Sequence, residues 1–330
     1  MKKISRDKIS IPKIKKSLLL HYLLLILLSL IILGPIYLMV LTSVKHQVVI
    51  MSRKPVWIFT PTMNNYGKIL FDENFLRHLL SSVMVGLLST VITLFVSGWA
   101  AYAIARMRFP GRGLMSNTTL IVRMVPPAVL AVPIVAMWQV WEIGLYSGNS
   151  NFFLAGLNQS YLDWINSTVV CTSSSYFLEA ICPLLNGGLA DGRLGLILFY
   201  SALNLPFTIW LLVGFIQQIP VELEEAAIVD GATPFQVYRK VLFPLMKSGY
   251  AVAAIFTFRI AWNEFLLALI LTSRTSYTLP VKITLFIRES GVQWGLIMAM
   301  GTLILIPPLL LTLFASRQII RGLTAGAVKG

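Results

Sequence analysis

Hydrophobic residues gather in long runs along this chain, and short polar and basic segments separate the runs. A helix needs about 20 predominantly apolar residues to cross the hydrocarbon core of a bilayer. Six runs have that length, and they cover residues 17–43, 79–105, 117–140, 194–217, 250–272 and 294–316. The pattern predicts an all-α polytopic membrane protein in which six transmembrane helices form one bundle.

Composition agrees with this pattern. The 330 residues are 57% hydrophobic and 12% charged, whereas soluble domains are about 45–50% apolar and about 25% charged. The net charge of +14 is also typical of proteins that bind nucleic acid. Here the cations are spread over the segments that flank the apolar runs and form no single patch, so we expect membrane lipid as their partner and no nucleic acid.

The distribution of Lys and Arg predicts an orientation. The first run is too long for a signal peptide and no small-residue cleavage site follows it, so we expect a retained helix. Lys and Arg are enriched in cytoplasmic segments of membrane proteins. With both termini in the cytoplasm, sixteen of the 27 Lys and Arg residues fall on inner segments and nine on outer segments. We therefore expect both termini to lie in the cytoplasm.

These spans divide the chain into predicted regions. They are a basic cytoplasmic tail (1–16), a first transmembrane helix (17–43), a periplasmic loop with an interfacial helix (44–78), a core transmembrane domain (79–316) and a cytoplasmic C-terminal tail (317–330). The core contains a long periplasmic insertion at 145–192 and a cytoplasmic loop at 219–247. Long loops without regular structure are commonly functional, and for this insertion a functional contact and a plain insertion both stay open.

Both cysteines, Cys171 and Cys182, lie in the periplasmic insertion. A disulfide forms readily in an oxidising compartment. Spacing alone does not show that the two Cα atoms come within about 7 Å of each other. A bridge and two free thiols therefore both remain possible at this point.

The cytoplasmic loop has a dense pattern that predicts two short helices. Pro220 suits a first helical position, and the three acidic residues that follow favour the positive N-terminal end of a helix. Gly231 suits the left-handed residue that closes a helix. Thr233 is the expected cap of the second helix, with Pro234 at its first position.

One face of the first short helix is unusually small. Leu223, Ala226 and Ala227 are three and four residues apart and therefore share a face. Alanines allow another backbone to approach closely. A loop without a partner would carry larger polar residues there, so we expect this face to bind another protein.

Several motifs resemble the permeases of ABC importers. The loop contains Glu225-Ala226-Ala227, then Asp230-Gly231-Ala232, then Val241-Leu242-Phe243-Pro244, which is similar to the EAA loop of that family. Segments at 101–112, 261–272 and 277–280 and the end of the chain resemble the maltose-type branch that takes up sugars. Where many sugar permeases carry a second proline four residues after Pro244, this chain has Ser248.

The resemblance implies a machine with several subunits in the bacterial inner membrane. The chain lacks the phosphate-binding G-x-x-x-x-G-K-[ST] pattern, so ATP and Mg are expected on partner subunits and no cofactor on this chain. The implied partners are a second, homologous permease, two cytoplasmic ATPase subunits and a periplasmic or lipid-anchored solute-binding protein. In the implied coupling site Glu225 contacts the ATPase, Ala226 and Ala227 allow close approach, Gly231 makes the turn and Asp230 braces the loop.

Polar residues inside membrane spans are costly, and they mark a transport path or an internal pair. The residues in question are Arg123, Asn204, Arg259, Asn263 and Glu264. Arg259 and Glu264 are five apart and lie on different faces of a helix, so we expect a pair between helices, such as Arg123 with Glu264. Unpaired arginines on the path would instead favour an anionic cargo, such as a sugar acid or glycerol phosphate.

Two other classes of protein fit the sequence less well. A membrane enzyme is disfavoured because His21, His46 and His78 form no metal-ligand spacing and no nucleophile with a base stands near them. An ion-driven secondary transporter would not need the EAA loop, and no paired broken helices indicate inverted repeats. The Pro126-Pro127 and Pro307-Pro308 pairs are interpreted as tolerated helix bends.

Overall fold

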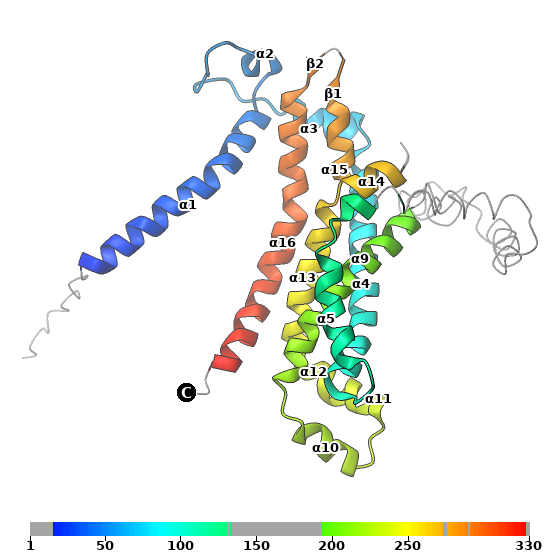
Figure 1. Cartoon of the computed structure of the whole chain (residues 1–330). Coiled ribbons are helices and arrows are strands. Elements are labelled where there is room, and N and C mark those ends of the chain that lie inside the picture. Colours follow the sequence, from blue (N-terminus) through cyan, green and yellow to red (C-terminus); the bar gives the residue numbers. More distant parts are fainter. Residues whose placement is uncertain (1–15, 131–132, 134–192, 273–275, 290, 328–330) are drawn as a thin grey trace, which may run out of the picture.

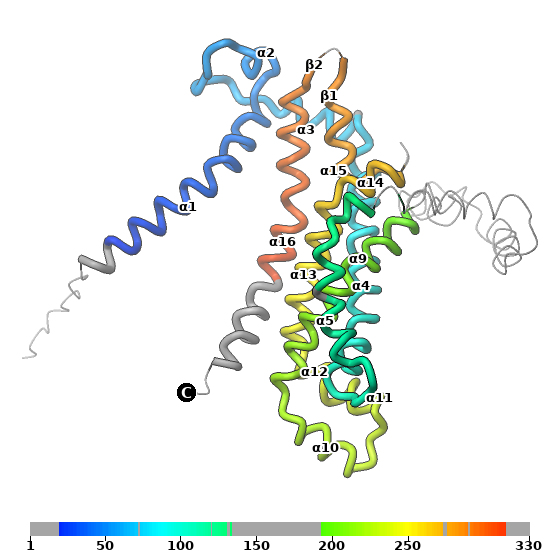
Figure 2. Tube along the Cα trace, viewed as in Figure 1, coloured from blue at the N-terminus to red at the C-terminus, as the bar shows by residue number. Residues whose placement is uncertain are grey.

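The protein is an elongated helical bundle in the computed structural model, which describes residues 16–130, 133, 193–272, 276–289 and 291–327 (Figures 1 and 2). The basic tail and the insertion at 145–192 with Cys171 and Cys182 lie outside these residues, so both predictions about them stay predictions. Helices account for nearly all regular structure in the described part of the chain. An all-α membrane fold was predicted and is confirmed at that level.

Among the described residues, four helices are long and apolar enough to cross a membrane, or five if one bent pair is counted as a span. The four are α1 (Lys16–Ser43), α4 (Phe75–Arg106), α9 (Arg193–Gln217) and α16 (Trp294–Ala327). They coincide with the first, second, fourth and sixth apolar runs. Helix α16 continues through the Pro307-Pro308 pair, as expected.

The third and fifth apolar runs form shorter helices than predicted. For the third run, α5 (Arg112–Arg123) ends just before the Pro126-Pro127 pair, and the structure describes little beyond it. For the fifth run, α13 (Lys247–Asn263) ends at Glu264, and a separate helix α14 (Leu266–Leu271) follows. A single unbroken helix over 250–272 is therefore wrong, because the backbone of Glu264 is extended (ψ 130°).

Small and hydroxylated residues bring α4 and α9 together. The buried face of α4 contains a series of serines and threonines, among them Ser89 and Thr93. Hydroxyl groups bond across the interface, as where Ser201 of α9 donates to the carbonyl of Ser89 at 3.3 Å. Small residues of this kind allow close helix packing in membranes. This α4–α9 pair is the axis on which α5 and α13 pack.

A sharp elbow joins the segment after Gly231 to α13. It contains α11 (Pro234–Val237), the π-helix η2 (Tyr238–Leu242) and α12 (Phe243–Leu245), and this segment is bent by 77° from α13. Gly98 of α4 faces the hydroxyls of Tyr238 and Tyr250, which hydrogen-bond to each other. Any Cβ at Gly98 would overlap both hydroxyls, so glycine permits this close approach.

The opposite end of the bundle carries short elements. They are α2 (Gln47–Ile50), α3 (Asn64–Gly67), the π-helix η1 (Lys68–Asp72), α15 (Leu279–Lys282), the 3-10 helix η3 (Ile283–Phe286) and the antiparallel hairpin of β1 (Ile287–Arg288) and β2 (Gly291–Val292). One interfacial helix was expected in the first outer loop, and the structure has three short helices there, α2, α3 and η1. Glu73 ties this region together, since one oxygen lies 2.9 Å from Lys282 Nζ and the other 3.5 Å from Arg288.

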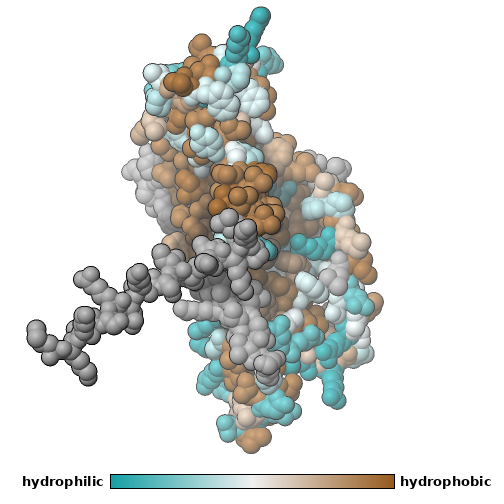
Figure 3. All heavy atoms as spheres, turned by 90° about the vertical axis from the view of Figure 1, so that its left-hand side faces the viewer, coloured by the Kyte–Doolittle hydropathy of each residue, from teal (hydrophilic) through white to brown (hydrophobic). Residues whose placement is uncertain are grey.

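Helix α1 stands apart from the bundle and diverges from α16 along its length (Figure 1). None of its most apolar stretch is buried, and its leucines and isoleucines are more than half exposed over residues 20–33. Figure 3 shows that hydrophobic residues cover much of the middle of this side of the molecule, with hydrophilic residues more frequent toward its two ends. Such a face requires lipid or another apolar surface.

Candidate functional site

The first short helix of the predicted coupling loop is α10 (Glu222–Val229), at the far end of the bundle from the hairpin (Figure 1). Its first turn contains Glu222, Glu224 and Glu225, where carboxylates stabilise the positive end of the helix dipole. It begins two residues after Pro220, so the placement of this proline at the first helical position is wrong. The residue at N-cap is Val221, whose backbone is already helical.

Gly231 closes α10 as predicted. Its φ of 81° lies in the left-handed region, which glycine enters without steric cost. The amide of Ala232 donates to the carbonyl of Ala227 at 2.9 Å, and the amide of Gly231 donates to that of Ile228 at 2.9 Å. This is the Schellman arrangement, which satisfies carbonyls at the end of the helix. Asp230 is the C-cap residue itself.

The helix that follows begins as the sequence predicted. The Thr233 side chain accepts a hydrogen bond from the amide of Gln236, and the Gln236 side chain accepts one from the amide of Thr233 at 2.9 Å. Pro234 occupies the first turn. This capping box fixes where the chain turns from α10 into the elbow.

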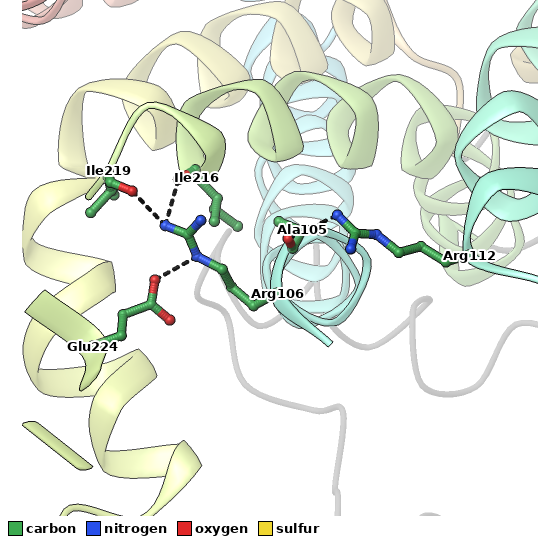
Figure 4. Close-up of polar contacts among 6 residues, drawn as sticks. All are labelled: Ala105, Arg106, Arg112, Ile216, Ile219 and Glu224. Atoms are coloured by element: carbon green, nitrogen blue, oxygen red, sulfur yellow. Dashed lines mark hydrogen bonds and ion pairs between the residues drawn. The ribbon is translucent and has the colours of Figure 1, made fainter. Parts of the chain in front are cut away.

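An arginine from α4 clamps α10 to the bundle (Figure 4). Arg106 Nε donates to Glu224 Oε1 at 2.5 Å. The same guanidinium donates through Nη2 to the carbonyls of Ile216 at 3.0 Å and Ile219 at 2.6 Å, at the end of α9. The two side chains are only 13% and 7% exposed. One arginine therefore connects three segments, namely the ends of α4 and α9 and the start of α10.

A second arginine secures the end of α4 itself. Arg112 Nη2 donates to the carbonyl of Ala105 at 3.0 Å, across the turn that leads into α5 (Figure 4). Cations near the C-terminal end of a helix satisfy its free carbonyls and favour its dipole. The end of α4, from which Arg106 reaches Glu224, is thus held in place by a contact between residues close in the chain.

The clamp was not identified from the sequence. Arg106 lies in the 101–112 segment, which was used only for its family resemblance, and Glu224 was treated as a first-turn acid. Glu224 is the buried member of the three acids, whereas Glu225 is exposed. The apolar pattern shows only that Arg106 lies at the end of a span. Its partner is 118 residues away along the chain.

The predicted contact face of α10 is open. Leu223 is 46% exposed, Ala226 is exposed and Ala227 is partly exposed. The clamp holds the carboxylate of Glu224, and these three residues keep this exposure with the clamp in place. Glu225 is next to them and is exposed as well. The geometry presents a small apolar surface with a free carboxylate beside it.

A cavity of about 340 Å³ lies in the middle of the bundle, among α5, α9 and α13. It is lined by three of the five predicted path residues, Arg123, Asn204 and Glu264, together with Tyr200. Arg259 and Asn263 are exposed and do not line it. Asn204 is buried and donates to the carbonyl of Tyr200 at 2.8 Å, so it also has a structural role.

The expected pair between Arg123 and Glu264 is wrong. Glu264 accepts hydrogen bonds from the hydroxyl of Tyr200 at 2.6 Å and from the amides of Leu267 and Ala268 at 3.0 and 3.2 Å. Its carboxylate thus caps α14, which explains why the helix breaks there. Arg123 instead lies over the ring of Phe207, with its Cζ atom 3.9 Å from the ring centre, a favourable cation–π contact.

Comparison with known proteins settles the family. The sequence profile of the family described as "Binding-protein-dependent transport system inner membrane component" matches residues 94–324. This chain belongs to that family. The match includes α10, the elbow and the cavity, and it makes the chain a permease of the inner membrane and a non-catalytic subunit of an ABC importer.

Two similar relatives are permeases as well. The permease is 32% identical to the diacetylchitobiose uptake system permease protein DasC of Streptomyces coelicolor over 90% of this chain and 91% of that protein. It is 35% identical to the trehalose transport system permease protein SugB of Mycobacterium tuberculosis over 82% and 83% of the two chains. The matches extend over most of both proteins, so the permease is similar to each along nearly its whole length.

A solved structure supports the fold alone. A chain of a bacterial ABC transporter that imports the acidic polysaccharide alginate is 18% identical and superposes with a TM-score of 0.63, covering 94% of this chain and 99% of that chain. The helical arrangement of the permease is therefore that of an ABC importer permease.

Proposed function

We propose that the permease forms half of the translocation path for a carbohydrate or carbohydrate-like solute, and that α10 couples it to a separate ATPase. The observation that carries this proposal is the combination of a clamped helix with an open face. Arg106 and Glu224 hold α10 on the bundle, while Leu223, Ala226 and Ala227 stay available. A helix that must transmit force needs both properties.

In this proposal six helices cross the membrane, both termini lie in the cytoplasm and α10 faces the cytoplasm. Closure of the ATPase subunits on ATP would push α10, with Glu225 as the charged contact. Because Arg106 binds α10 and the end of α9 together, the displacement would pass into α4 and α9 and from them into the cavity-lining helices. ATP and Mg bind to the partner, and Gly231 and Asp230 fix the end of the lever.

The partners follow the family pattern of a second homologous permease, two ATPase subunits and a solute-binding protein. The exposed, divergent α1 supports a second membrane subunit, since a bare apolar helix offers a large surface for packing. The hairpin end is the proposed contact for the binding protein. It contains the first outer loop and the described part of the stretch at 273–293.

The cavity among α5, α9 and α13 is the proposed solute path. The polar side chains of Arg123, Asn204, Tyr200 and Glu264 lie among apolar lining residues, a combination that suits the hydroxyls and apolar faces of a sugar. The relatives named for diacetylchitobiose and trehalose support carbohydrate cargo.

An anionic carbohydrate is the second candidate cargo. Arg123 and Arg259 are exposed, and neither joins an ion pair within the described part of the chain. Arg123 lines the proposed path and would favour a sugar acid or glycerol phosphate there, whereas Arg259 lies outside the lining. A thermal-shift screen of neutral and acidic sugars on the partner binding protein separates the two, because a bound solute stabilises the folded protein.

Solute uptake by a Glu225→Arg variant tests the coupling role. We expect uptake to be abolished while the variant remains folded in the membrane, because the ATPase contact becomes repulsive. Gln218→Arg is the control, since Gln218 is also exposed but lies outside α10 and leaves Glu225 in place. Normal uptake by Glu225→Arg, or equal loss in the control, would contradict the proposal.

A further inference from the structure

A second cavity lies on the outside of the bundle at the elbow. It has a volume of about 600 Å³ and lies between α4, the α11–η2–α12 segment and the first turns of α13. We call it the elbow groove. Small-molecule sites have volumes of roughly 300–1,000 Å³, so the elbow groove is large enough for part of a ligand.

The walls of the elbow groove are aromatic and aliphatic. Six of the twelve described lining residues are aromatic, namely Phe95, Trp99, Phe235, Tyr238, Phe243 and Tyr250. Phe95 and Phe235 are 68% and 54% exposed, so this apolar surface is not covered by the chain itself. Trp99 and Phe235 stack with ring centres 5.4 Å apart, which makes one wall flat.

Two cations complete the lining. Arg239 and Lys247 are exposed, and neither forms an ion pair within the described residues. None of the lining residues is acidic. The groove therefore combines a long apolar surface with positive charge that nothing in the described chain neutralises.

In the orientation of the proposed function, on which this inference rests, the elbow groove lies at the edge of the membrane. The segment from Pro234 to Leu245 is bent by 77° from α13, so it runs nearly at right angles to a membrane-spanning helix. Phe243 and Leu245 on this segment are 44% and 51% exposed. A short apolar segment that lies across the bundle axis is typical of the interface, where aromatic rings sit at headgroup depth.

From these observations we propose that the elbow groove binds an anionic phospholipid, with an acyl chain along the aromatic wall and the phosphate between Arg239 and Lys247. Basic pockets between transmembrane helices on the cytoplasmic side bind anionic headgroups. A lipid in this position would touch both α4 and the elbow, the two elements that Gly98 brings together.

Native mass spectrometry of the purified full-length permease tests the proposal, with phosphatidylglycerol and phosphatidylcholine as probes. The expected result is a clear preference for phosphatidylglycerol, which Arg239→Gln/Lys247→Gln reduces about tenfold or more. Arg53→Gln/Lys54→Gln removes the same charge from exposed positions in the loop that leads to α3 and should leave binding unchanged. No preference, or equal loss in both double variants, would overturn the proposal.

A groove-filling variant distinguishes the groove from general surface charge. Ala251→Phe keeps both cations but occupies space in the elbow groove, so phosphatidylglycerol should be lost. Retention by this folded variant would overturn the acyl-chain assignment. The same measurement on the co-purified pair of permeases should still detect the lipid. Loss of the lipid on pairing would show instead that a helix of the second permease occupies the elbow groove. None of these lipid-binding measurements depends on transport, so a negative result leaves the coupling role of α10 untouched.

Discussion

Ion pairs tie loops to the bundle at both ends of the permease, but the two ends bury them differently. At the α10 end, Arg106 and Glu224 are 13% and 7% exposed and the arginine also serves two carbonyls. At the hairpin end, Glu73 is 22% exposed and shares its charge between Lys282, which is 12% exposed, and Arg288, which is 51% exposed. The ion pair at the α10 end is therefore shielded from solvent, whereas the ion pairs at the hairpin end include the exposed side chain of Arg288.

The difference indicates which loop moves as a unit with the helices. Breaking a buried ion pair by removing one partner costs about 3–5 kcal/mol, whereas an exposed pair contributes about 0–1 kcal/mol. The α10 end should therefore follow α4 and α9 as a rigid extension. The hairpin end can change its contacts at little cost, which suits a surface that receives a partner.

The largest effect is expected from Arg106→Met. It leaves Glu224 and two carbonyls of the α9 end without their donor, and the loss should be about 3–5 kcal/mol. The thermal unfolding of the purified permease measures it. Arg108→Met is the matched control, because Arg108 is exposed two residues away and should change stability little.

A double variant sharpens this result. Arg106→Met/Glu224→Leu replaces the ion pair with apolar side chains and should recover much of the lost stability, because no charge stays buried alone. If the double variant is less stable than Arg106→Met alone, the cost does not come from an orphaned charge and the clamp is misassigned.

The next effect is expected at Gly98. Gly98→Ala forces the Tyr238–Tyr250 pair apart, and overpacking of this kind costs about 1–3 kcal/mol. Gly214→Ala provides the comparison, since nothing lies within 4 Å of a Cβ at that helical position and alanine favours a helix. Equal stability of the two variants would mean that the elbow does not pack tightly on α4.

A smaller effect is expected at the end of α10. Gly231→Val places a β-branched residue at φ 81°, which costs about 1–2 kcal/mol, and uptake should fall because the lever loses its fixed turn. Gly231→Asn should be milder, since asparagine tolerates the left-handed region. Identical uptake by both variants would argue against a need for this turn.

The smallest effect is expected at the hairpin end. Glu73→Gln removes the charge that Lys282 and Arg288 share, and the change in stability should be under about 1 kcal/mol. Thermal unfolding again provides the measurement. A loss as large as that of Arg106→Met would abolish the contrast between the two ends.

Local features of the fold were predictable from the sequence. Long apolar runs predicted the four spanning helices, because hydrophobic length is set by the bilayer alone. Gly231 and Thr233 were placed correctly, since a left-handed turn and a helix cap depend on residues close in the chain. Pro220 was misplaced because the start of a helix can be assigned from sequence only to within one or two residues.

Features that depend on distant partners were not predictable. Glu264 ends α13 because Tyr200 from another helix and two nearby amides take up its carboxylate, and nothing in the apolar run around it indicates that break. The same applies to Arg106 and Glu224, which meet only after α4, α9 and α10 have packed. The apolar pattern identifies spans, but it does not identify which charges inside them find each other.

Labelling of Ala226→Cys tests the central claim most directly. In a background with Cys171→Ser and Cys182→Ser, a membrane-impermeant maleimide should react with this cysteine in inside-out vesicles and not in right-side-out vesicles. Addition of the ATPase subunits should protect it, because α10 then lies in the subunit contact. Labelling from the outer face, or no protection by the ATPase, would contradict the assignment of α10 as the cytoplasmic coupling helix.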